Sequence, residues 1–541
     1  MKVLGIGGSA HDYAAALTVD GKIACAVEEE RLARVKHSFG LLKTGRLGLA
    51  TGYCLDAAGI SLNDIDLLVT NSAMFGQEHF TRDRRYEVIT HHLAHAASAF
   101  YPSGFDDAAI LVVDALGSEC PTGPETTSWA VGEGNQVRIL EQVTGKRLGD
   151  GYDSFVTNSL GYYYTLATIL CGFALFDEGK TMGLAPYSSG PPLDEVFRAI
   201  ELLPDGRFQI TEAAADLMDA AARRYVGAAA DKGDQFRREA RVAMSAQAAL
   251  EKVLLHCARH AVRLTGKRRL CLAGGTALNS VANGRILREA GIEALFVQPA
   301  ANDAGTALGA ALYGEYGLGN ARRGPREVES CRMSNAYTGR TYPAAEIARA
   351  IAEAGLTSVT TENPARAAAR AVAEGRIVGW FCGGSEYGPR ALGHRSILAD
   401  PRRADMKDIL NARVKHREAF RPFAPSVLLG EQGRFFVNDC PSPFMLLVCD
   451  VREEARALLP AITHVDGTAR VQTVPDDDNE PYSRLLKELG ALTGVPVVLN
   501  TSFNDKGEPI VETPQDAIRT FLKTGMDVLV MEDFVVSRGG W

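Results

Sequence analysis

Two short clusters of cations in the second half of the chain could bind a highly charged anion. Their sequences are EYGPRALGHRS, which begins at Glu386, and KHREAFRPF, which begins at Lys415. Arginine presents a planar fork of donors that matches phosphate and carboxylate oxygens, and the glycines let the backbone approach an anion closely. A solvated charge run is the alternative, but apolar residues such as Phe423 flank both clusters. The clusters therefore predict a pocket for a small phosphate compound, lined by their five lysine and arginine side chains.

Two further polar positions in the same half of the chain extend this pocket. Arg470 lies in the segment TARVQTV, and Ser502 lies in NTSFN, directly after an expected strand at residues 495–499. Hydroxyl and amide groups that follow a strand occupy typical ligand positions at the carboxyl edge of a sheet. We therefore expect both side chains near the cation clusters.

A second kind of chemistry is indicated by the segment HHLAH, which begins at His91. His91 and His95 are four residues apart, so on a helix they share one face and can bind one metal ion. Asp114 ends an expected strand, and Asp303 lies in a loop beside a glycine. Two histidines and two aspartates suit Fe, Mn or Zn better than a soft metal. The alternative is a pair of surface histidines, and His92 could be a second-shell or a surface residue.

Glycine-rich turns supply possible phosphate contacts in the first half of the chain. AGGTALN, residues 273–279, follows an expected strand and opens a helix, the geometry in which backbone N–H groups meet phosphates. Its candidate contacts are Gly274, Gly275 and Asn279. A second such loop is FDEGKTMGLAP at residues 176–186. The alternative for each loop is a tight packing turn.

His11 and Lys36 are candidate reactive residues near the amino terminus. His11 follows the first expected strand and its GGS turn, where it could accept a proton from an attacking hydroxyl at neutral pH. A capping or turn role is the alternative for His11. Lys36 ends the charged stretch that begins with EEER, which reads as a solvated charge run unless the lysine reaches a phosphate.

The elements that must position these residues form a repeated pattern. Residues 3–27 read as a strand followed by a hairpin with an Asp-Gly turn, and residues 109–143 repeat a strand followed by a hairpin. This repeat suits a duplicated α/β domain. Residues 211–265 have helical spacing, and residues 314–335, rich in Gly, Arg and Ser, read as a linker. The remainder mixes helices with strands.

Composition narrows the class of protein. The 541 residues are 46% hydrophobic and 23% charged, which predicts an ordinary globular chain of two to four domains. A net charge of −8 with no basic stripe argues against nucleic acid as a partner. Ten scattered cysteines without a CxxC pair exclude a zinc ribbon and favour reduced thiols in the cytoplasm. No apolar run reaches the length of about 18 residues that a membrane span needs.

Taken together, six motifs resemble the NodU/CmcH family of O-carbamoyltransferases, which modify nodulation factors and antibiotics. They are HHLAHAASAF, EGKTMGLAPY, LAGGTALN, GPRALGHRSILADPR, KHREAFRPFAPS and LNTSFNDKGEPIVETPQDAI. The resemblance covers nearly the full length. It implies an α/β fold in which a duplicated actin-like (ASKHA) domain at residues 1–330 binds a metal and transfers the carbamoyl group. A YrdC-like domain at residues 336–541 would form carbamoyl-adenylate.

The resemblance also implies a two-step reaction. Carbamoyl phosphate and ATP, with Mg²⁺, would give carbamoyl-adenylate and pyrophosphate, and a hydroxyl of a sugar or another natural product would then accept the carbamoyl group. The residues implied to hold carbamoyl phosphate and the adenylate are Arg390, Lys415, Arg421, Arg470 and Ser502.

The remaining roles implied by the resemblance fall in the first domain. A divalent metal, expected to be Fe²⁺, would bind His91, His95, Asp114 and Asp303. His11 would be the base or would orient the carbonyl group, and Lys36 with the 273–279 loop would contact the adenylate. The expected partners are small molecules only, with neither nucleic acid nor membrane, and the oligomeric state is left open, with a homodimer as one candidate.

One segment departs from the family pattern. The family usually has Asp-Gly-x-Gly-Glu after the second metal strand, whereas this chain has DALGSE at residues 114–119, with one extra residue before the acid. Asp114 is kept, but Glu119 is left out of the expected site. Acceptor contacts are expected in the helices around 190–245 and in loops such as 71–86.

Three other classes of protein are less consistent with the chain. A hydrogenase-maturation carbamoyltransferase needs an acylphosphatase unit and Cys-rich zinc fingers ahead of its YrdC-like domain, and this chain has neither. A tRNA-modifying enzyme fits poorly with the acidic balance of charge. A non-enzymatic actin-like regulator would require the arginine pocket to be vestigial, although its motifs are intact.

Overall fold

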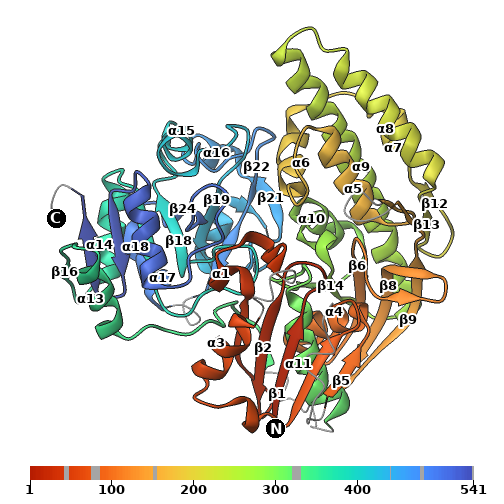
Figure 1. Cartoon of the computed structure of the whole chain (residues 1–541). Helices are drawn as coiled ribbons and strands as arrows, with labels where there is room; N and C mark the ends of the chain where they lie inside the picture. Colours follow the sequence, from red (N-terminus) through yellow and green to blue (C-terminus); the bar gives the residue numbers. More distant parts are fainter. Residues whose placement is uncertain are drawn as a thin grey trace. The chain divides into compact units, whose positions relative to one another are not determined.

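The computed structural model describes residues 1–41, 48–74, 86–149, 155–319, 331–438, 440–475 and 480–538 (Figure 1). The chain divides into two compact units. The first comprises Met1–Ile23 and Ser61–Met333, and the second comprises Ala24–Ile60 and Ser334–Trp541. No helix among the described residues is long and apolar enough to cross a membrane.

The first unit opens with a five-stranded sheet in the order β3-β2-β1-β4-β5. Its strands are β1 (Lys2–Gly7), β2 (Ala14–Val19), β3 (Lys22–Glu28), β4 (Leu67–Asn71) and β5 (Tyr86–Ile89). β1 pairs antiparallel with β2 and parallel with β4, and β4 pairs parallel with β5. Asp20 and Gly21 both have positive φ, as a tight hairpin turn between β2 and β3 requires.

A second sheet repeats this arrangement. Its path is β15-β14-β6-β8, with β9 beside β8. The strands are β6 (Asp107–Val113), β8 (Gly123–Glu133), β9 (Gln136–Thr144), β14 (Arg269–Ala273) and β15 (Ala294–Val297). β6 pairs antiparallel with β8, β8 antiparallel with β9, β6 parallel with β14, and β14 parallel with β15. Because the order and directions match those of the first sheet, the predicted duplicated actin-like fold is confirmed.

Two short helices of small residues lie at the centre of the first unit. They are α4 (His91–Phe100) and α11 (Gly305–Tyr313). A Cβ atom at Gly309 would lie only 1.8 Å from the carbonyl oxygen of Ala94, so the two backbones touch where a larger residue would separate them. This close approach brings the histidines of α4 toward the loop that precedes α11.

The first unit contains further helices, and two of them, α8 and α9, confirm the helical prediction for residues 211–265. They are α5 (Leu160–Leu170), α6 (Glu178–Leu184), α7 (Asp194–Phe197), α8 (Glu212–Gly227), α9 (Lys232–Thr265) and α10 (Ser280–Glu289). Figure 1 shows α8 and α9 as long, neighbouring helices drawn in yellow-green. In the predicted linker, residues 320–330 lie outside the described part of the chain.

The second unit is built on one mixed sheet of eight strands, in the order β16-β26-β25-β17-β18-β24-β19-β23. The strands are β16 (Val359–Thr360), β17 (Val378–Phe381), β18 (Arg395–Ala399), β19 (Ala424–Leu428), β23 (Gln472–Val474), β24 (Val497–Ser502), β25 (Val528–Met531) and β26 (Phe534–Ser537). A separate three-stranded sheet joins β20 (Phe436–Val437), β21 (Val448–Val451) and β22 (Thr468–Arg470).

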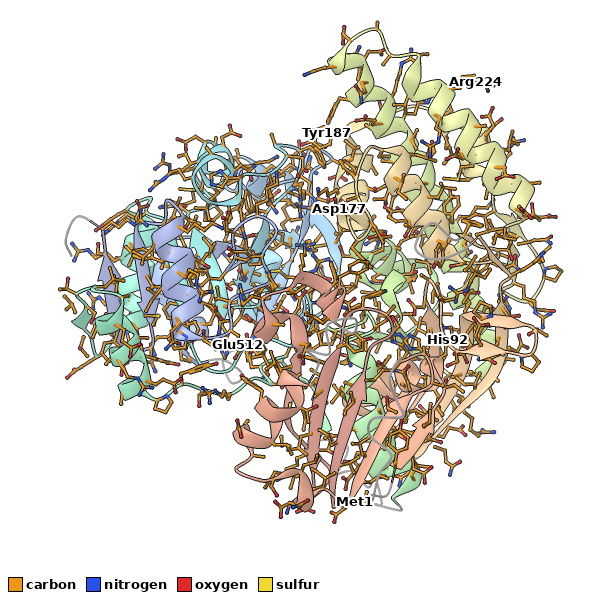
Figure 2. All side chains as sticks on the ribbon, in the orientation of Figure 1. Met1, His92, Asp177, Tyr187, Arg224 and Glu512 are labelled. Carbon is orange, nitrogen blue, oxygen red and sulfur yellow. The ribbon has the colours of Figure 1, made fainter. Side chains whose placement is uncertain are left out.

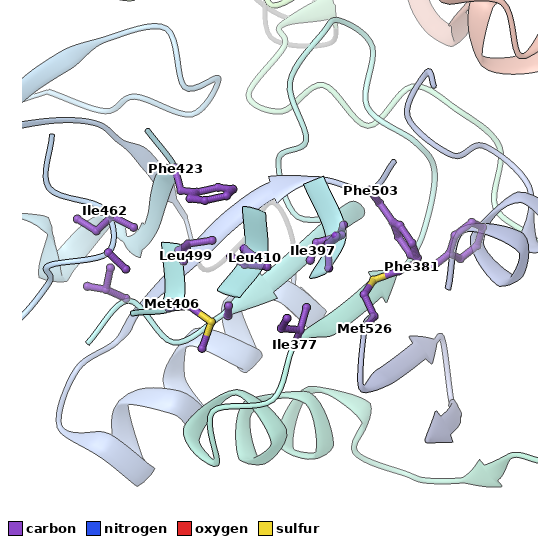
Figure 3. Packing of buried hydrophobic residues seen from close by; sticks show 14 of the residues in the cluster. Ile377, Phe381, Ile397, Met406, Leu410, Phe423, Ile462, Leu499, Phe503 and Met526 are labelled. Atoms are coloured by element: carbon purple, nitrogen blue, oxygen red, sulfur yellow. The ribbon is translucent and has the colours of Figure 1, made fainter. Parts of the chain in front are cut away.

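Both faces of the large sheet are covered by helices. The helices are α13 (Ala344–Glu353), α14 (Pro364–Ala373), α17 (Glu480–Thr493) and α18 (Pro514–Lys523). Ile397 of β18 packs in a buried cluster with α13 and α18, which Figure 3 shows from close by. Its neighbour Leu398 packs in another cluster with α14 and α17. Successive side chains of a strand point to opposite faces, so the sheet is the middle layer of three.

Residues 24–60 pack with the second unit, although they precede most of the first in the sequence. This segment contains most of β3, together with α1 (Glu29–Ala33) and α3 (Leu49–Ala57). Arg31 of α1 is fully buried and donates to the carbonyl oxygen of Gly388, whose own N–H donates to Glu28 at 2.6 Å. The domain predicted at residues 1–330 therefore differs from the observed first unit by this segment.

Candidate metal centre and anion pocket

Four predicted metal ligands converge in the first unit. His91, His95, Asp114 and Asp303 are all buried, and each offers a ligand atom within 4.8 Å of the other three. His91 Nε2 lies 3.2 Å from Asp114 Oδ2 and 3.5 Å from Asp303 Oδ1. His95 Nε2 lies 3.6 Å and 3.7 Å from the same two oxygens. The alternative of surface histidines is therefore wrong.

The secondary structure explains why these four side chains meet. The two histidines lie one turn apart on α4, so they share a face of that helix. Asp114 directly follows β6, and Asp303 lies in the turn that precedes α11. Gly275 donates its backbone N–H to Asp114 Oδ1 at 3.1 Å, which fixes the orientation of that carboxylate.

Opposite charges balance one another in this cluster. Burial lowers the pKa of His91, but Asp303 and Asp114 outweigh it and raise that pKa to about 10. Burial and Asp303 raise the pKa of Asp114, yet His91 and His95 hold it below the usual range.

The donor atoms fit a divalent cation of borderline softness, since they comprise two imidazole nitrogens and two carboxylate oxygens. Nδ1 of His91 lies 3.1 Å from Asn71 Oδ1, which leaves Nε2 to face the carboxylates. A bound cation would take the place of the proton that the cluster otherwise holds.

His11 lies beside this cluster in the same unit. Its Nδ1 is 3.2 Å from Asp12 Oδ2, and its ring meets the ring of Phe176 edge-on at 4.7 Å between centroids. Burial lowers the pKa of His11, but the hydrogen bond and charge of Asp12 and the charges of Asp303 and Asp114 raise it to about 9. His11 is thus protonated at neutral pH in this arrangement and suited to donate a hydrogen bond to a carbonyl oxygen.

Asp12 and Phe176, the two neighbours of His11, both have positive φ, with values of 53° and 68°. Aspartate adopts the left-handed region readily, whereas a bulky side chain such as that of Phe176 does so rarely and mostly at functional sites. The conformation of Phe176, which contacts the His11 ring, supports a functional role for this region.

The glycine-rich loop at 273–279 has structural partners of its own. Gly274 has φ of +88°, and a Cβ atom there would lie 2.3 Å from the carbonyl oxygen of Val113. Asn279 caps α10 by accepting from the N–H of Ala282 at 3.0 Å, and it exchanges two hydrogen bonds with Gln247. The packing-turn alternative thus accounts for Gly274 and Asn279, and nucleotide binding by this loop stays a prediction.

The second unit contains the predicted cluster of cations. Lys415 is buried, and its Nζ donates to Ser502 Oγ at 3.2 Å and to Asn504 Oδ1 at 2.8 Å. Burial, followed by the charges of Arg417 and Arg421, lowers the pKa of Lys415 well below its usual value. Ser502 is the last residue of β24 and pairs with Ser396 of β18, so the strand extends three residues beyond the predicted end at residue 499.

Arginines of this unit also lower one another's pKa. Burial and Arg421 lower the pKa of Arg390 to about 10, and burial together with Arg390, Arg417 and Arg421 lowers that of Arg470 well below its usual value. Arginine stays protonated at neutral pH, so these directions express the cost of burial and, after it, the repulsion between neighbouring arginines. Among the described residues, Nε of Arg390 and Nε of Arg470 are buried without a hydrogen-bond partner. Such a site is suited to an anion with several charged oxygens.

Two arginines of the cation motifs differ from expectation. Arg395 was expected to line the pocket, but it is fully buried and donates to the carbonyl oxygens of Cys382 and Gly383, each at 3.0 Å. Its role is structural. Arg417 was given no individual role, yet it is one of the charges that lower the pKa of Lys415 and Arg470. Its place in the KHREAFR motif was the available signal.

Two other charged residues need separate comment. Lys36 lies in a different unit than expected, and Glu119 lies outside the site. Lys36 belongs to the second unit, near enough to Lys415 to lower its pKa, rather than to the unit with the glycine-rich loop. Glu119 is exposed and pairs with Arg147 at 3.3 Å, which agrees with its omission from the site. Besides Asp114, Glu125 on β8 is a buried acid of this region, and the sequence did not single it out.

Comparisons with known proteins identify the family. Domains described as the carbamoyltransferase N-terminus and C-terminus match residues 72–312 and 369–538. The chain is 40% identical over 570 residues to nodulation protein NolNO of Sinorhizobium fredii, with 98% of this chain and 79% of that protein covered. It is 36% identical over 264 residues to the 3′-hydroxymethylcephem-O-carbamoyltransferase of Amycolatopsis lactamdurans, with 49% of this chain and 48% of that protein covered.

Among solved structures, full-length HypF in its phosphate- and nucleotide-bound form aligns with a TM-score of 0.41 at 14% identity, covering 58% of this chain and 55% of that one. The matches in sequence carry the conclusion. The chain belongs to the carbamoyltransferase family and is an enzyme of that family.

Proposed function

We propose that the protein is an ATP-dependent O-carbamoyltransferase that works in two half-reactions. The second unit forms carbamoyl-adenylate, and the first unit transfers the carbamoyl group to a hydroxyl of a sugar or another natural product. The observation that carries this proposal is the separation of chemistries. The buried cation cluster lies in one unit, and the His/Asp cluster lies in the other.

The first half-reaction must balance atoms and charge. Water cleaves carbamoyl phosphate to carbamate and orthophosphate, a carbamate oxygen attacks the α-phosphorus of ATP, and pyrophosphate leaves. These reactants carry many negative charges, so bringing them together requires a dense group of cations. Arg390, Arg421 and Arg470 would hold phosphate groups. Lys415, oriented by its bond to Ser502, would do the same, and Mg²⁺ would accompany ATP.

The second half-reaction needs a positioned carbonyl group and a stabilised leaving group. The four side chains of the His/Asp cluster would hold a divalent cation, which we propose to be Fe²⁺. When bound, it would supply Lewis-acid stabilisation of negative charge on the AMP leaving group. His11, protonated at neutral pH, would donate a hydrogen bond to the carbamoyl oxygen and so orient the carbonyl group, and the proton of the attacking hydroxyl would leave with the AMP phosphate. The N–H of Gly275 keeps the Asp114 carboxylate in place.

A hydroxyl acceptor is supported by one relative. The name of the Amycolatopsis enzyme specifies a hydroxymethyl group as its carbamoylation site. For this chain, helices α7 and α8 and the first part of α9 fall within the segment around 190–245 in which acceptor contacts are predicted. Most of the loop predicted at 71–86 lies outside the described residues.

Pyrophosphate exchange into ATP tests the proposal before the acceptor is known. Wild-type protein with Mg²⁺ should incorporate labelled pyrophosphate into ATP only when carbamoyl phosphate is present. Hydroxylated sugars and natural products are then screened by mass spectrometry for the gain of a carbamoyl group. Exchange that is absent, or that ignores carbamoyl phosphate, would contradict the first half-reaction.

A further inference from the structure

A single buried carboxylate connects the two elements that supply three of the four ligands in the His/Asp cluster. Glu125, the third residue of β8, is 1% exposed. Its Oε2 accepts from the backbone N–H of His92 at 3.2 Å and from the backbone N–H of Ser118 at 3.1 Å. His92, which Figure 2 labels, lies on α4 between the two ligand histidines, and Ser118 lies in the loop that follows Asp114.

The first two N–H groups of α4 donate to residues of this region. The first N–H groups of a helix have no partner within the helix. That of His91 donates to Ser118 Oγ at 2.8 Å, that of His92 donates to Glu125, and that of Leu93 donates to Thr90 Oγ1 at 3.3 Å. Two of these three bonds thus depend on Glu125. The N–H of His92 donates to Glu125 itself, and the N–H of His91 donates to Ser118, whose own N–H donates to Glu125.

The loop after Asp114 is tied to the same glutamate through its backbone. Gly117 N–H donates to the carbonyl oxygen of Glu125 at 2.8 Å, and Glu125 N–H donates to that of Ser118 at 3.0 Å. A Cβ atom at Gly117 would lie 2.8 Å from the His92 ring and 2.9 Å from Glu125 Oε2. The loop therefore packs directly against the carboxylate, and glycine leaves the room that this contact needs.

We propose that Glu125 is a positioning residue for the metal centre. It holds the helix that carries His91 and His95 at a fixed distance from the strand end that carries Asp114. The proposal rests on the proposed function, since it assumes that the His/Asp cluster binds a divalent cation. Partners behind the direct ligands typically change metal affinity by about 10–100-fold when they are removed.

Gln142 of β9 allows the hydrogen bonds to be separated from the position of the carboxylate. Its Nε2 donates to Glu125 Oε1 at 2.8 Å. Glu125→Gln would place an amide N–H₂ against that donor, whereas the double variant Glu125→Gln/Gln142→Glu would restore a donor–acceptor pair. The oxygen facing the N–H groups of His92 and Ser118 is kept in the double variant.

Titration of metal-free protein with Co²⁺ alone, followed by its visible absorption, tests the inference. Wild type should bind one equivalent, and His95→Ala should lose that site. Glu125→Ala should bind Co²⁺ about 10–100-fold more weakly. Glu125→Gln should also bind more weakly, with recovery in the double variant. Glu119→Ala, which removes an exposed glutamate of the same loop, should match wild type.

Melting temperatures show which variants fold. If Glu125→Ala does not fold, the Co²⁺ affinities of Glu125→Gln and of the double variant Glu125→Gln/Gln142→Glu test the positioning role instead. Wild-type Co²⁺ affinity in a folded Glu125→Ala or Glu125→Gln protein would overturn the positioning role alone. The absence of a His95-dependent Co²⁺ site in wild type would overturn the metal centre of the proposed function, and the inference with it.

Discussion

In the first unit, buried charges of both signs lie within 4 Å of one another, whereas in the second unit Lys415 lies among cations that outnumber the one carboxylate beside it, that of Asp505. In the first unit, the pKa of His91 rises and those of the two aspartates fall, so each charge is stabilised by its neighbours. In the second unit, the pKa values of Lys415 and Arg470 fall because burial and like charges disfavour them. In the first site, a metal cation can replace the proton that the histidines and aspartates share. In the second site, a bound anion would offset the repulsion between the buried cations.

Removing a metal ligand should have the largest effect. His95→Ala should reduce carbamoyl transfer below detection, because the buried carboxylates of Asp114 and Asp303 lose one of the two imidazoles beside them. Transfer is measured by mass spectrometry of the acceptor, and bound metal by elemental analysis. His256→Ala, at a histidine that contacts the carbonyl oxygen of Leu203, is the matched control. Full transfer by a folded His95→Ala protein would remove the metal centre from the reaction.

His11→Asn should affect the first unit alone. Transfer to the acceptor should fall by about 10²–10⁴, the usual contribution of a positioned acid or base. Carbamoyl-adenylate synthesis and metal content should stay unchanged, and hydrolysis of the adenylate should become its main fate. If His11 only stabilises its turn, the melting temperature and both half-reactions should decline together. Normal transfer by the variant would exclude His11 from the mechanism.

Arg390→Ala should affect the second unit alone. Losing one charge-assisted contact to phosphate should cost roughly 1.5–3 kcal/mol, or tenfold or more in binding. Arg390→Lys should recover little, because lysine lacks the planar fork. Arg403→Ala, at an exposed arginine paired with Asp405, is the control and should resemble wild type. Preformed carbamoyl-adenylate should restore transfer by Arg390→Ala, and failure of this rescue in folded protein would count against the assignment.

The smallest expected effect is proton uptake by Lys415. Its lowered pKa means that the anion-free protein binds fewer protons than the unfolded chain between that pKa and the usual value of about 10.4. Stability should therefore rise with pH across this window in the anion-free protein. Pyrophosphate should raise the pKa again, so its binding within this window should take up part of a proton. Calorimetry in two buffers of different ionisation enthalpy measures this uptake, which Lys415→Met should abolish.

The metal-type cluster could be predicted because its members carry local signals. His91 and His95 have helical spacing, so periodicity alone placed these two ligands on one face of a helix, and Asp114 was a candidate because it ends an apolar strand. The strand and hairpin at residues 3–27 and their repeat at residues 109–143 likewise predicted the duplicated sheet. The contact with Asp303 depends on the packing of α4 against α11, and here the resemblance to a family supplied what periodicity could not.

Other features left no local signal. Glu125 binds backbone N–H groups, which every residue except proline offers, so nothing in the sequence marks its partners. Arg31, within the run EEERLAR, resembles a solvated charge but is fully buried in the second unit. The unit on which a segment such as residues 24–60 packs is decided by tertiary contacts, which composition and spacing do not encode.

The separation of the two half-reactions is tested most directly by carbamoyl-phosphate-dependent exchange of pyrophosphate into ATP in the folded His95→Ala and Arg390→Ala proteins. We expect His95→Ala to exchange at the wild-type rate while making no carbamoylated product, and Arg390→Ala to lose exchange by tenfold or more. Loss of exchange in His95→Ala, or wild-type exchange in Arg390→Ala, would contradict the assignment of one half-reaction to each unit.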